Sequence, residues 1–196
     1  MISETLVVAA EYERLKDWDA TRKSVLDQNL LNKVKQATFT REFSEIKKRL
    51  SLLTSGQLNL MITGSLDDAK AMILLSLAKL YAYFKEFVAE VLCNKYLIFD
   101  TVLTEVDYNK FFNMKSLSHD ELNTITDNTA RKVKQRVFTL FEQVGLITQS
   151  KNGTIIKPVL SHQVIDVIIA DDPAFLMVFL YSNEEIKNLL QNIKHA

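Results

Sequence analysis

The chain has 196 residues and a mass of 22.5 kDa; 47% of its residues are hydrophobic and 24% are charged, which suits a folded protein with one good-sized core or two small ones. Basic and acidic residues balance at 24 each, which excludes a polybasic, histone-like protein but allows local basic patches. Four glycines and two prolines are too few for the many tight turns of a β-sandwich or β-barrel. The single cysteine, Cys93, excludes an intrachain disulfide and a cysteine-based zinc site, and it fits a reducing, cytoplasmic setting.

These counts favour helices. With the motifs described below, the sequence predicts an all-α, compact helical domain that contains helix-turn-helix elements and one small β-hairpin wing near residues 146–157. In chain order, we expect an N-terminal helical, helix-turn-helix segment at 1–64 and a central helical core at 65–115. A winged helix-turn-helix-like segment at 116–160 and C-terminal helices at 161–196 follow, and Ser182 with Glu185 forms a capping-box pattern in the last of these segments. Because there is no repeat of fixed period and no low-complexity linker, we expect these segments to form one compact unit.

The N-terminal segment is basic, with ten basic and five acidic residues between positions 14 and 49. Helices are predicted at 3–16, at about 20–28 after a cap at Asp19, and after a cap at Thr40. The last two can form a helix-turn-helix, whose candidate DNA contacts are Lys33, Lys35, Arg41, Ser44 and Lys48. Glu42 and Glu45 dilute the charge, so a surface helix with internal ion pairs explains the pattern equally well.

The most apolar stretch runs from residue 69 to residue 99 and is predicted to form one long helix, opened by Ser65 and ending near Asn94. Charged residues interrupt it, and its longest uncharged window, 71–78, is well short of the ~20 residues that a membrane-spanning helix needs. We therefore expect a buried core helix and no membrane association.

Residues 118–158 predict a winged helix-turn-helix. Ser118 and Glu121 form a capping-box pattern before a short helix, a tight connection spans 124–127, and a longer helix runs to Val144. Two β-prone runs then flank a turn that contains Asn152-Gly153. In this motif the second helix enters the major groove of DNA and the wing touches the backbone beside it.

The longer helix is predicted to present a polar, basic face opposite its apolar residues. Arginine and lysine can donate to guanine or phosphate, and asparagine and glutamine can pair with adenine. The candidate DNA-binding residues are Asn128, Thr129, Arg131, Lys132, Lys134 and Gln135, with Lys151 from the wing. A solvated helix face is the alternative, but four basic residues within positions 131–136 and no acidic one favour DNA.

Catalysis finds little support in the sequence. The histidines His119, His162 and His195 are dispersed, and none lies in a metalloprotease motif or a close pair with a carboxylate. The glycines are isolated, so no loop can cradle a phosphate. We expect no enzyme activity, no metal, no cofactor and no small-molecule substrate.

Several segments, in order and spacing, resemble the BrxA family of bacteriophage exclusion (BREX) systems. They are Asn29-Leu30-Leu31, then Thr40-Arg41 with Ile46 and Arg49-Leu50; the apolar helix at 74–91; Asn128-Thr129-Ala130-Arg131-Lys132 leading to Phe138; residues 140–147; and Ile156-Lys157-Pro158. The resemblance implies a mainly α-helical, cytoplasmic protein that binds double-stranded DNA through helix-turn-helix elements and acts in phage defence. It also implies partners: the methyltransferase, the ATPases and the other subunits of the system.

Together these observations predict a non-catalytic, double-stranded DNA-binding subunit of a BREX-type system. The alternative is a protein–protein adaptor of the same complex, whose basic patches bind acidic partner proteins.

Overall fold

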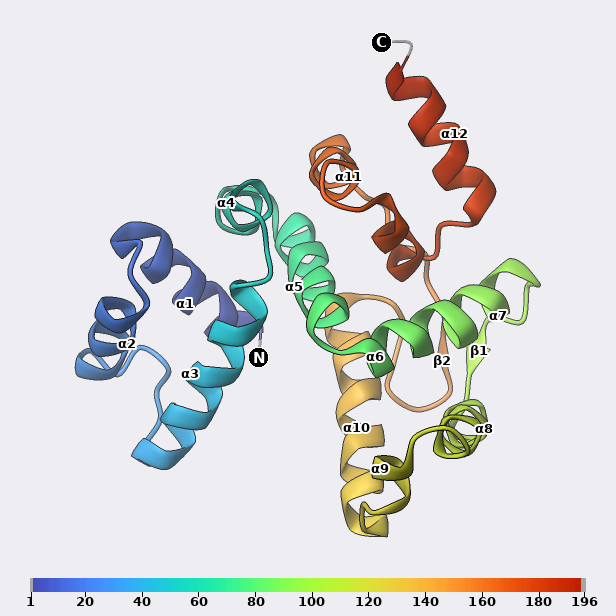
Figure 1. Cartoon of the computed structure of the whole chain (residues 1–196), viewed down its shortest axis with the longest axis horizontal. Helices are drawn as coiled ribbons and strands as arrows, with labels where there is room; N and C mark the ends of the chain where they lie inside the picture. Colours follow the sequence, from blue (N-terminus) through green and yellow to red (C-terminus); the bar gives the residue numbers. More distant parts are fainter. Residues whose placement is uncertain (1, 195–196) are drawn as a thin grey trace. The chain divides into compact units, whose positions relative to one another are not determined.

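The computed structural model describes residues 2–194 and divides the chain into two compact units (Figure 1). The first unit takes in the residues up to Tyr81 together with Leu160–Pro173, and the second takes in Ala82–Val159 together with the residues from Ala174 onward. Helices dominate both units, and in the described residues the strands amount to one small antiparallel element. The expected fold class, all-α with a small β-hairpin, is therefore confirmed.

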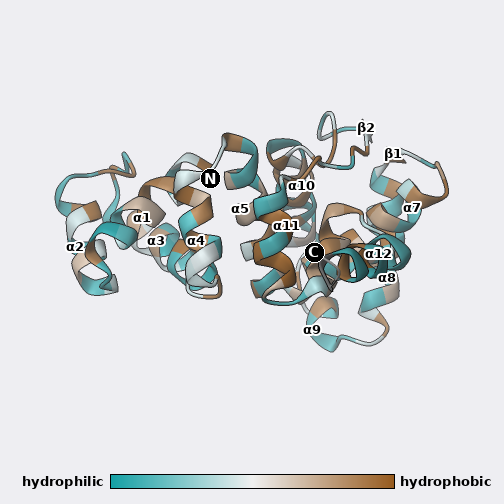
Figure 2. Ribbon diagram, turned by 90° about the horizontal axis from the view of Figure 1, so that it is seen from above, coloured by the Kyte–Doolittle hydropathy of each residue, from teal (hydrophilic) through white to brown (hydrophobic). Residues whose placement is uncertain are grey.

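The first unit is a helical bundle around α5. Its elements are α1 (Ile2–Leu15), α2 (Trp18–Asp27), α3 (Gln36–Leu50), α4 (Ser55–Thr63), α5 (Leu66–Leu80) and α11 (His162–Ile169). Helices α1, α3, α4 and α11 all pack on α5, whose residues 71–78 are buried without interruption. Most residues of α11 are apolar and coloured brown on the ribbon in Figure 2, which explains why this distant segment joins the N-terminal helices.

Two predicted helix starts in this unit are wrong. The cap of α2 is Asp17, whose side chain accepts a hydrogen bond from the Ala20 amide, and not Asp19. Thr40 lies inside α3, which begins a full turn earlier because Phe39 is buried and stacks on Phe43 with ring centroids 5.8 Å apart. The cap at Ser65 is confirmed: Ser65 and Asp68 form a reciprocal capping box at the start of α5.

The long helix expected from Ser65 to about Asn94 is also wrong, because it breaks at Tyr81. Tyr81 is extended, with φ −112° and ψ 98°, and its phenol hydrogen-bonds the Glu45 carboxylate. The chain continues as α6 (Ala82–Phe87), a π-helical segment η1 (Val88–Cys93) and α7 (Asn94–Leu97). The wider π-helical turn buries Val88, Leu92 and Cys93, so core packing takes precedence over a regular helix.

The second unit contains α6, η1 and α7 followed by a short strand, a set of helices and a hairpin. Its further elements are β1 (Val102–Leu103), α8 (Glu105–Ser116), α9 (Asp120–Asn123), α10 (Asp127–Val144), β2 (Gly153–Thr154) and α12 (Asn183–Lys194); the 3-10 helix η2 (Pro173–Phe179) begins at its boundary. The core is aromatic: Phe87 is fully buried, with ring centroids 5.0 Å from Phe111, 5.4 Å from Tyr108 and 5.8 Å from Phe141. This cluster fixes α10 against α6 and α8.

Of the two capping boxes expected in the second half of the chain, one is present. Ser182 and Glu185 exchange hydrogen bonds at the start of α12, as predicted. Ser118 instead donates to the Lys115 carbonyl and so finishes α8, while α9 begins after His119 without a side-chain cap. The capping box at Ser118 is wrong because its hydroxyl is used by the preceding helix.

No helix within residues 2–194 combines the length and the apolar character needed to cross a bilayer.

Candidate nucleic-acid interface

Helix α10 runs to Val144, as the sequence predicts. The Thr126 hydroxyl accepts a hydrogen bond from the Thr129 amide and starts the helix. Gly145 ends it in the left-handed conformation, with φ 81°, where a side chain would be strained. Phe138 and Phe141 are buried on its inner side, which turns the opposite side toward solvent.

The solvent side of α10 carries a basic and amide-rich stripe. Five of the candidate residues are exposed there: Asn128, Thr129, Arg131, Lys132 and Gln135. Arg136, which is not among the predicted DNA contacts, is exposed one helical turn beyond Lys132. Within residues 2–194, neither Lys132 nor Arg136 makes an ion pair, and Arg131 has only a 3.3 Å hydrogen bond to the Asn128 side-chain oxygen. Their charges are available to an external anion.

Lys134 lies on the flank of α10 instead of on this stripe. Its side chain is 18% exposed, and its Nζ is 2.6 Å from Glu105 Oε2 and 3.5 Å from Asn109 Oδ1. Both partners come from α8. This lysine is therefore already engaged by the neighbouring helix.

The hairpin after α10 forms close to its predicted position. The Ile156 amide donates to the Leu146 carbonyl over 2.8 Å, and the Thr148 amide donates to the Thr154 carbonyl over 3.0 Å. Gly153 is required in its loop, because a Cβ there would lie 2.1 Å from the Gln149 carbonyl oxygen. Lys151 is exposed in this loop, as expected.

Two contacts hold the hairpin in place. Glu142 on α10 accepts a 3.1 Å hydrogen bond from the Ser150 amide, which fixes the loop beside the helix. On its other side, Val102 pairs with Thr154 and Leu103 with Gly153 in antiparallel register. Strand β1 was not expected, although the β-prone run of residues 101–104 was a signal for it. The loop and α10 therefore present one continuous surface.

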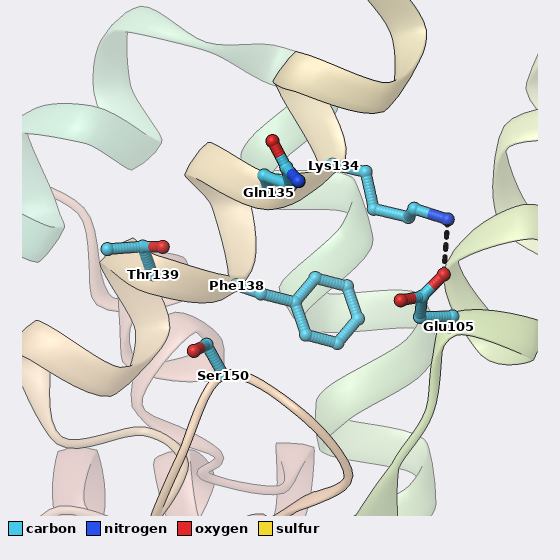
Figure 3. Close-up of a pocket in the computed structure, with 6 residues that line it drawn as sticks. All are labelled: Glu105, Lys134, Gln135, Phe138, Thr139 and Ser150. Atoms are coloured by element: carbon cyan, nitrogen blue, oxygen red, sulfur yellow. Dashed lines mark hydrogen bonds and ion pairs between the residues drawn. The ribbon is translucent and has the colours of Figure 1, made fainter.

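A shallow cavity of about 360 Å³ opens between α10, the loop and the start of α8. Figure 3 shows Lys134 reaching from α10 to Glu105 beside this opening. The residues that line it are Glu105, Lys134, Gln135, Phe138, Thr139 and Ser150. The Lys134 ammonium, which hydrogen-bonds the Glu105 carboxylate, holds the pKa of this acid below its usual value, and the charge of Lys151 lowers it further.

The N-terminal candidates belong to the other unit. Arg41, Ser44 and Lys48 are exposed along one side of α3, and Lys35 is exposed at its start. Lys33 is paired with Glu42 at 2.9 Å and with Glu4 at 3.5 Å, and the hydrogen bond to Glu42 raises its pKa. The internal ion pairs foreseen for this segment thus occupy Lys33 but leave the solvent side of α3 unpaired among the described residues.

The described residues hold no cluster of three or more histidine, cysteine or acidic side chains that could bind a metal. His119 and His162 are exposed and far apart in the sequence, and His195 lies outside the described residues.

Two comparisons with known proteins point to the same family. A family model described as BrxA matches residues 1–172. A protein named "BREX protein BrxA" from Bacillus cereus (strain H3081.97) is 32% identical over 128 residues, 65% of this chain, and the chain spans 64% of the length of that relative. A crystal structure of an uncharacterized protein from Magnetospirillum magneticum is similar with a TM-score of 0.79 over 91% of this chain and 92% of that one; at 18% identity it shows a shared fold.

Proposed function

This chain belongs to the BrxA family, and from that premise we propose that it is a non-catalytic, double-stranded DNA-binding subunit of a BREX-type phage-defence system. The observation that carries the proposal is the stripe of exposed basic and amide side chains on α10, whose cations make no ion pair among the described residues. These side chains are not part of the core, and their chemistry matches the base edges and phosphates of a duplex.

The order of elements supports a winged helix-turn-helix. A short strand, helices α8, α9 and α10, and a hairpin follow one another, and the strand pairs with the hairpin. In this arrangement α10 is the recognition helix and the loop at 149–153 is the wing. Arg131, Lys132 and Arg136 reach phosphates or guanines, while Asn128 and Gln135 face adenine edges.

The exposed side of α3 is a second proposed contact. Lys35, Arg41, Ser44 and Lys48 carry three positive charges and one hydroxyl, and the described residues offer these charges no acidic partner. They are suited to phosphate contact, and because they include no amide side chain they lack the bidentate contacts to adenine.

Other BREX subunits, among them the methyltransferase and the ATPases, are the proposed protein partners. One observation favours the adaptor alternative as a second function: Phe99 is 89% exposed, Ile98 is 72% exposed, and Phe99 has a φ of +62°, which is strained for an aromatic residue. An exposed apolar residue held at such a cost is typical of a binding anchor.

A salt series of fluorescence-anisotropy titrations with a random-sequence duplex tests the proposal. Four candidate cations lie on α10 and the loop, namely Arg131, Lys132, Arg136 and Lys151, so we expect the logarithm of the association constant to fall with the logarithm of salt concentration at a slope of about −4. Binding that is absent at low salt, from a sample shown to be folded by circular dichroism, contradicts DNA binding and favours the adaptor.

A further inference from the structure

An acidic residue of α8 lies at the edge of the basic surface. Glu105, the first residue of α8, lies beside the cavity between α10 and the loop. Its carboxylate is 2.6 Å from Lys134 Nζ, and Lys151 acts on it through its charge. Two proposed DNA-binding lysines, one from α10 and one from the loop, therefore act on the same carboxylate, and Figure 3 shows the contact with Lys134.

The capping box of α8 does not involve Glu105, although an acid in the first turn suits the helix dipole. The cap of α8 is a reciprocal box between Thr104 and Asp107, in which Asp107 Oδ2 accepts from the Thr104 amide over 2.8 Å and from its hydroxyl over 2.7 Å. The other Asp107 oxygen is 3.4 Å from Lys95 Nζ. The Glu105 carboxylate takes no part in these bonds, and among the described residues it bonds a cation of the proposed DNA surface.

The pairing is also easily broken. The Glu105 side chain is 62% exposed, whereas the Lys134 side chain on the flank of α10 is 18% exposed. An exposed ion pair contributes about 0–1 kcal/mol in water, so an incoming phosphate can replace the carboxylate at little cost. Both anions offer oxygen acceptors to the same ammonium group.

We propose that Glu105 is an internal substitute for a DNA phosphate: it occupies Lys134 in the free protein and must be displaced when a duplex binds. The inference rests on the proposed function of α10, and it adds that Glu105 competes with DNA phosphates for Lys134. Glu105 lowers the affinity for every duplex alike, because phosphates carry no sequence information. Stable binding then depends more strongly on the base contacts of Asn128 and Gln135.

The test is the variant Glu105→Gln, titrated with a random duplex at near-physiological salt. We expect binding about three- to tenfold tighter than that of the unchanged protein, and a salt slope steeper by about one, since Lys134 gains a phosphate. Glu184→Gln is the matched control: it removes the same charge from an exposed position on α12 and is expected to leave the affinity within about twofold.

A double-mutant cycle shows whether Glu105 acts through Lys134. In a Lys134→Ala background, Glu105→Gln is expected to change the affinity by less than about twofold. An equal gain in both backgrounds overturns the proposal, because it indicates general repulsion of DNA by the carboxylate. Melting curves by circular dichroism confirm that each variant is folded.

The remaining outcomes separate this proposal from the function on which it rests. If the unchanged protein binds DNA and Glu105→Gln binds no more tightly, the competitor role is overturned while DNA binding stands. If neither binds at low salt, both the proposed function and the competitor role are contradicted.

Discussion

Replacing Arg131 and Lys132 together with alanine is expected to weaken binding of duplex DNA about tenfold to a hundredfold at near-physiological salt. Both side chains are exposed on α10, and neither contributes to the core or to an ion pair among the described residues. Each substitution removes one cation from the proposed DNA-binding surface, so the slope of affinity against salt concentration also becomes shallower by about two. Fluorescence anisotropy over a salt series measures both changes.

The control for this variant is Lys110→Ala with Lys187→Ala. It removes the same charge from exposed positions of the same unit, on α8 and α12, outside the α10 stripe. We expect its affinity for DNA to stay within about threefold of that of the unchanged protein, because these two lysines act on DNA only through the overall electrostatic field of the protein. Equal losses in the two double variants contradict the assignment to α10, and an unchanged affinity in the Arg131 and Lys132 variant removes this helix from the site.

The second large effect concerns stability. Phe87→Ala is expected to lower the unfolding free energy by about 3–5 kcal/mol, because it empties the centre of a close-packed aromatic cluster. Phe87 is 0% exposed and contacts the rings of Phe111 on α8 and Phe141 on α10. Urea denaturation followed by circular dichroism measures the loss.

Phe99→Ala is the matched control for the core variant. It makes the same chemical change at a side chain that is 89% exposed, so we expect a change in unfolding free energy of less than about 0.5 kcal/mol. A comparable loss at Phe99 and Phe87 contradicts the assignment of the core.

Helix α10 illustrates what local sequence determines. A threonine cap, apolar residues at helical spacing and a terminal glycine all act within a few residues of one another, and all three are found in the structure. The exposed side follows directly from the buried one, which is why Asn128, Lys132 and Gln135 could be predicted to be exposed. Arg136 obeys the same spacing and could have been included.

The break at Tyr81 could not be predicted, since neither proline nor glycine marks it. It depends on a bond from Tyr81 to Glu45, which is 36 residues away, and on the preference of Val88, Leu92 and Cys93 for the core. The same applies to α11: its apolar side indicates burial but not which helices bury it.

Charge pairing over long distances in the sequence limits prediction of the site in the same way. Lys134 is paired with Glu105, 29 residues earlier, and Lys33 with Glu4, also 29 residues earlier. Counting charges along the chain treats both lysines as available, whereas the fold brings acids to them. Arg49 is a third case: it belongs to the basic N-terminal segment, yet its side chain is buried.

Site-directed photo-crosslinking tests the central claim most directly. The only cysteine, Cys93, is buried, and burial raises the pKa of its thiol, so a new exposed cysteine can be labelled selectively. Gln135→Cys on α10 and Asn188→Cys on α12, each carrying a photoreactive label, are irradiated with a duplex of about 20 base pairs, two helical turns. We predict crosslinks to DNA from position 135 and few from position 188; equal yields, or crosslinks from position 188 alone, would contradict the assignment of α10 as the DNA-binding element.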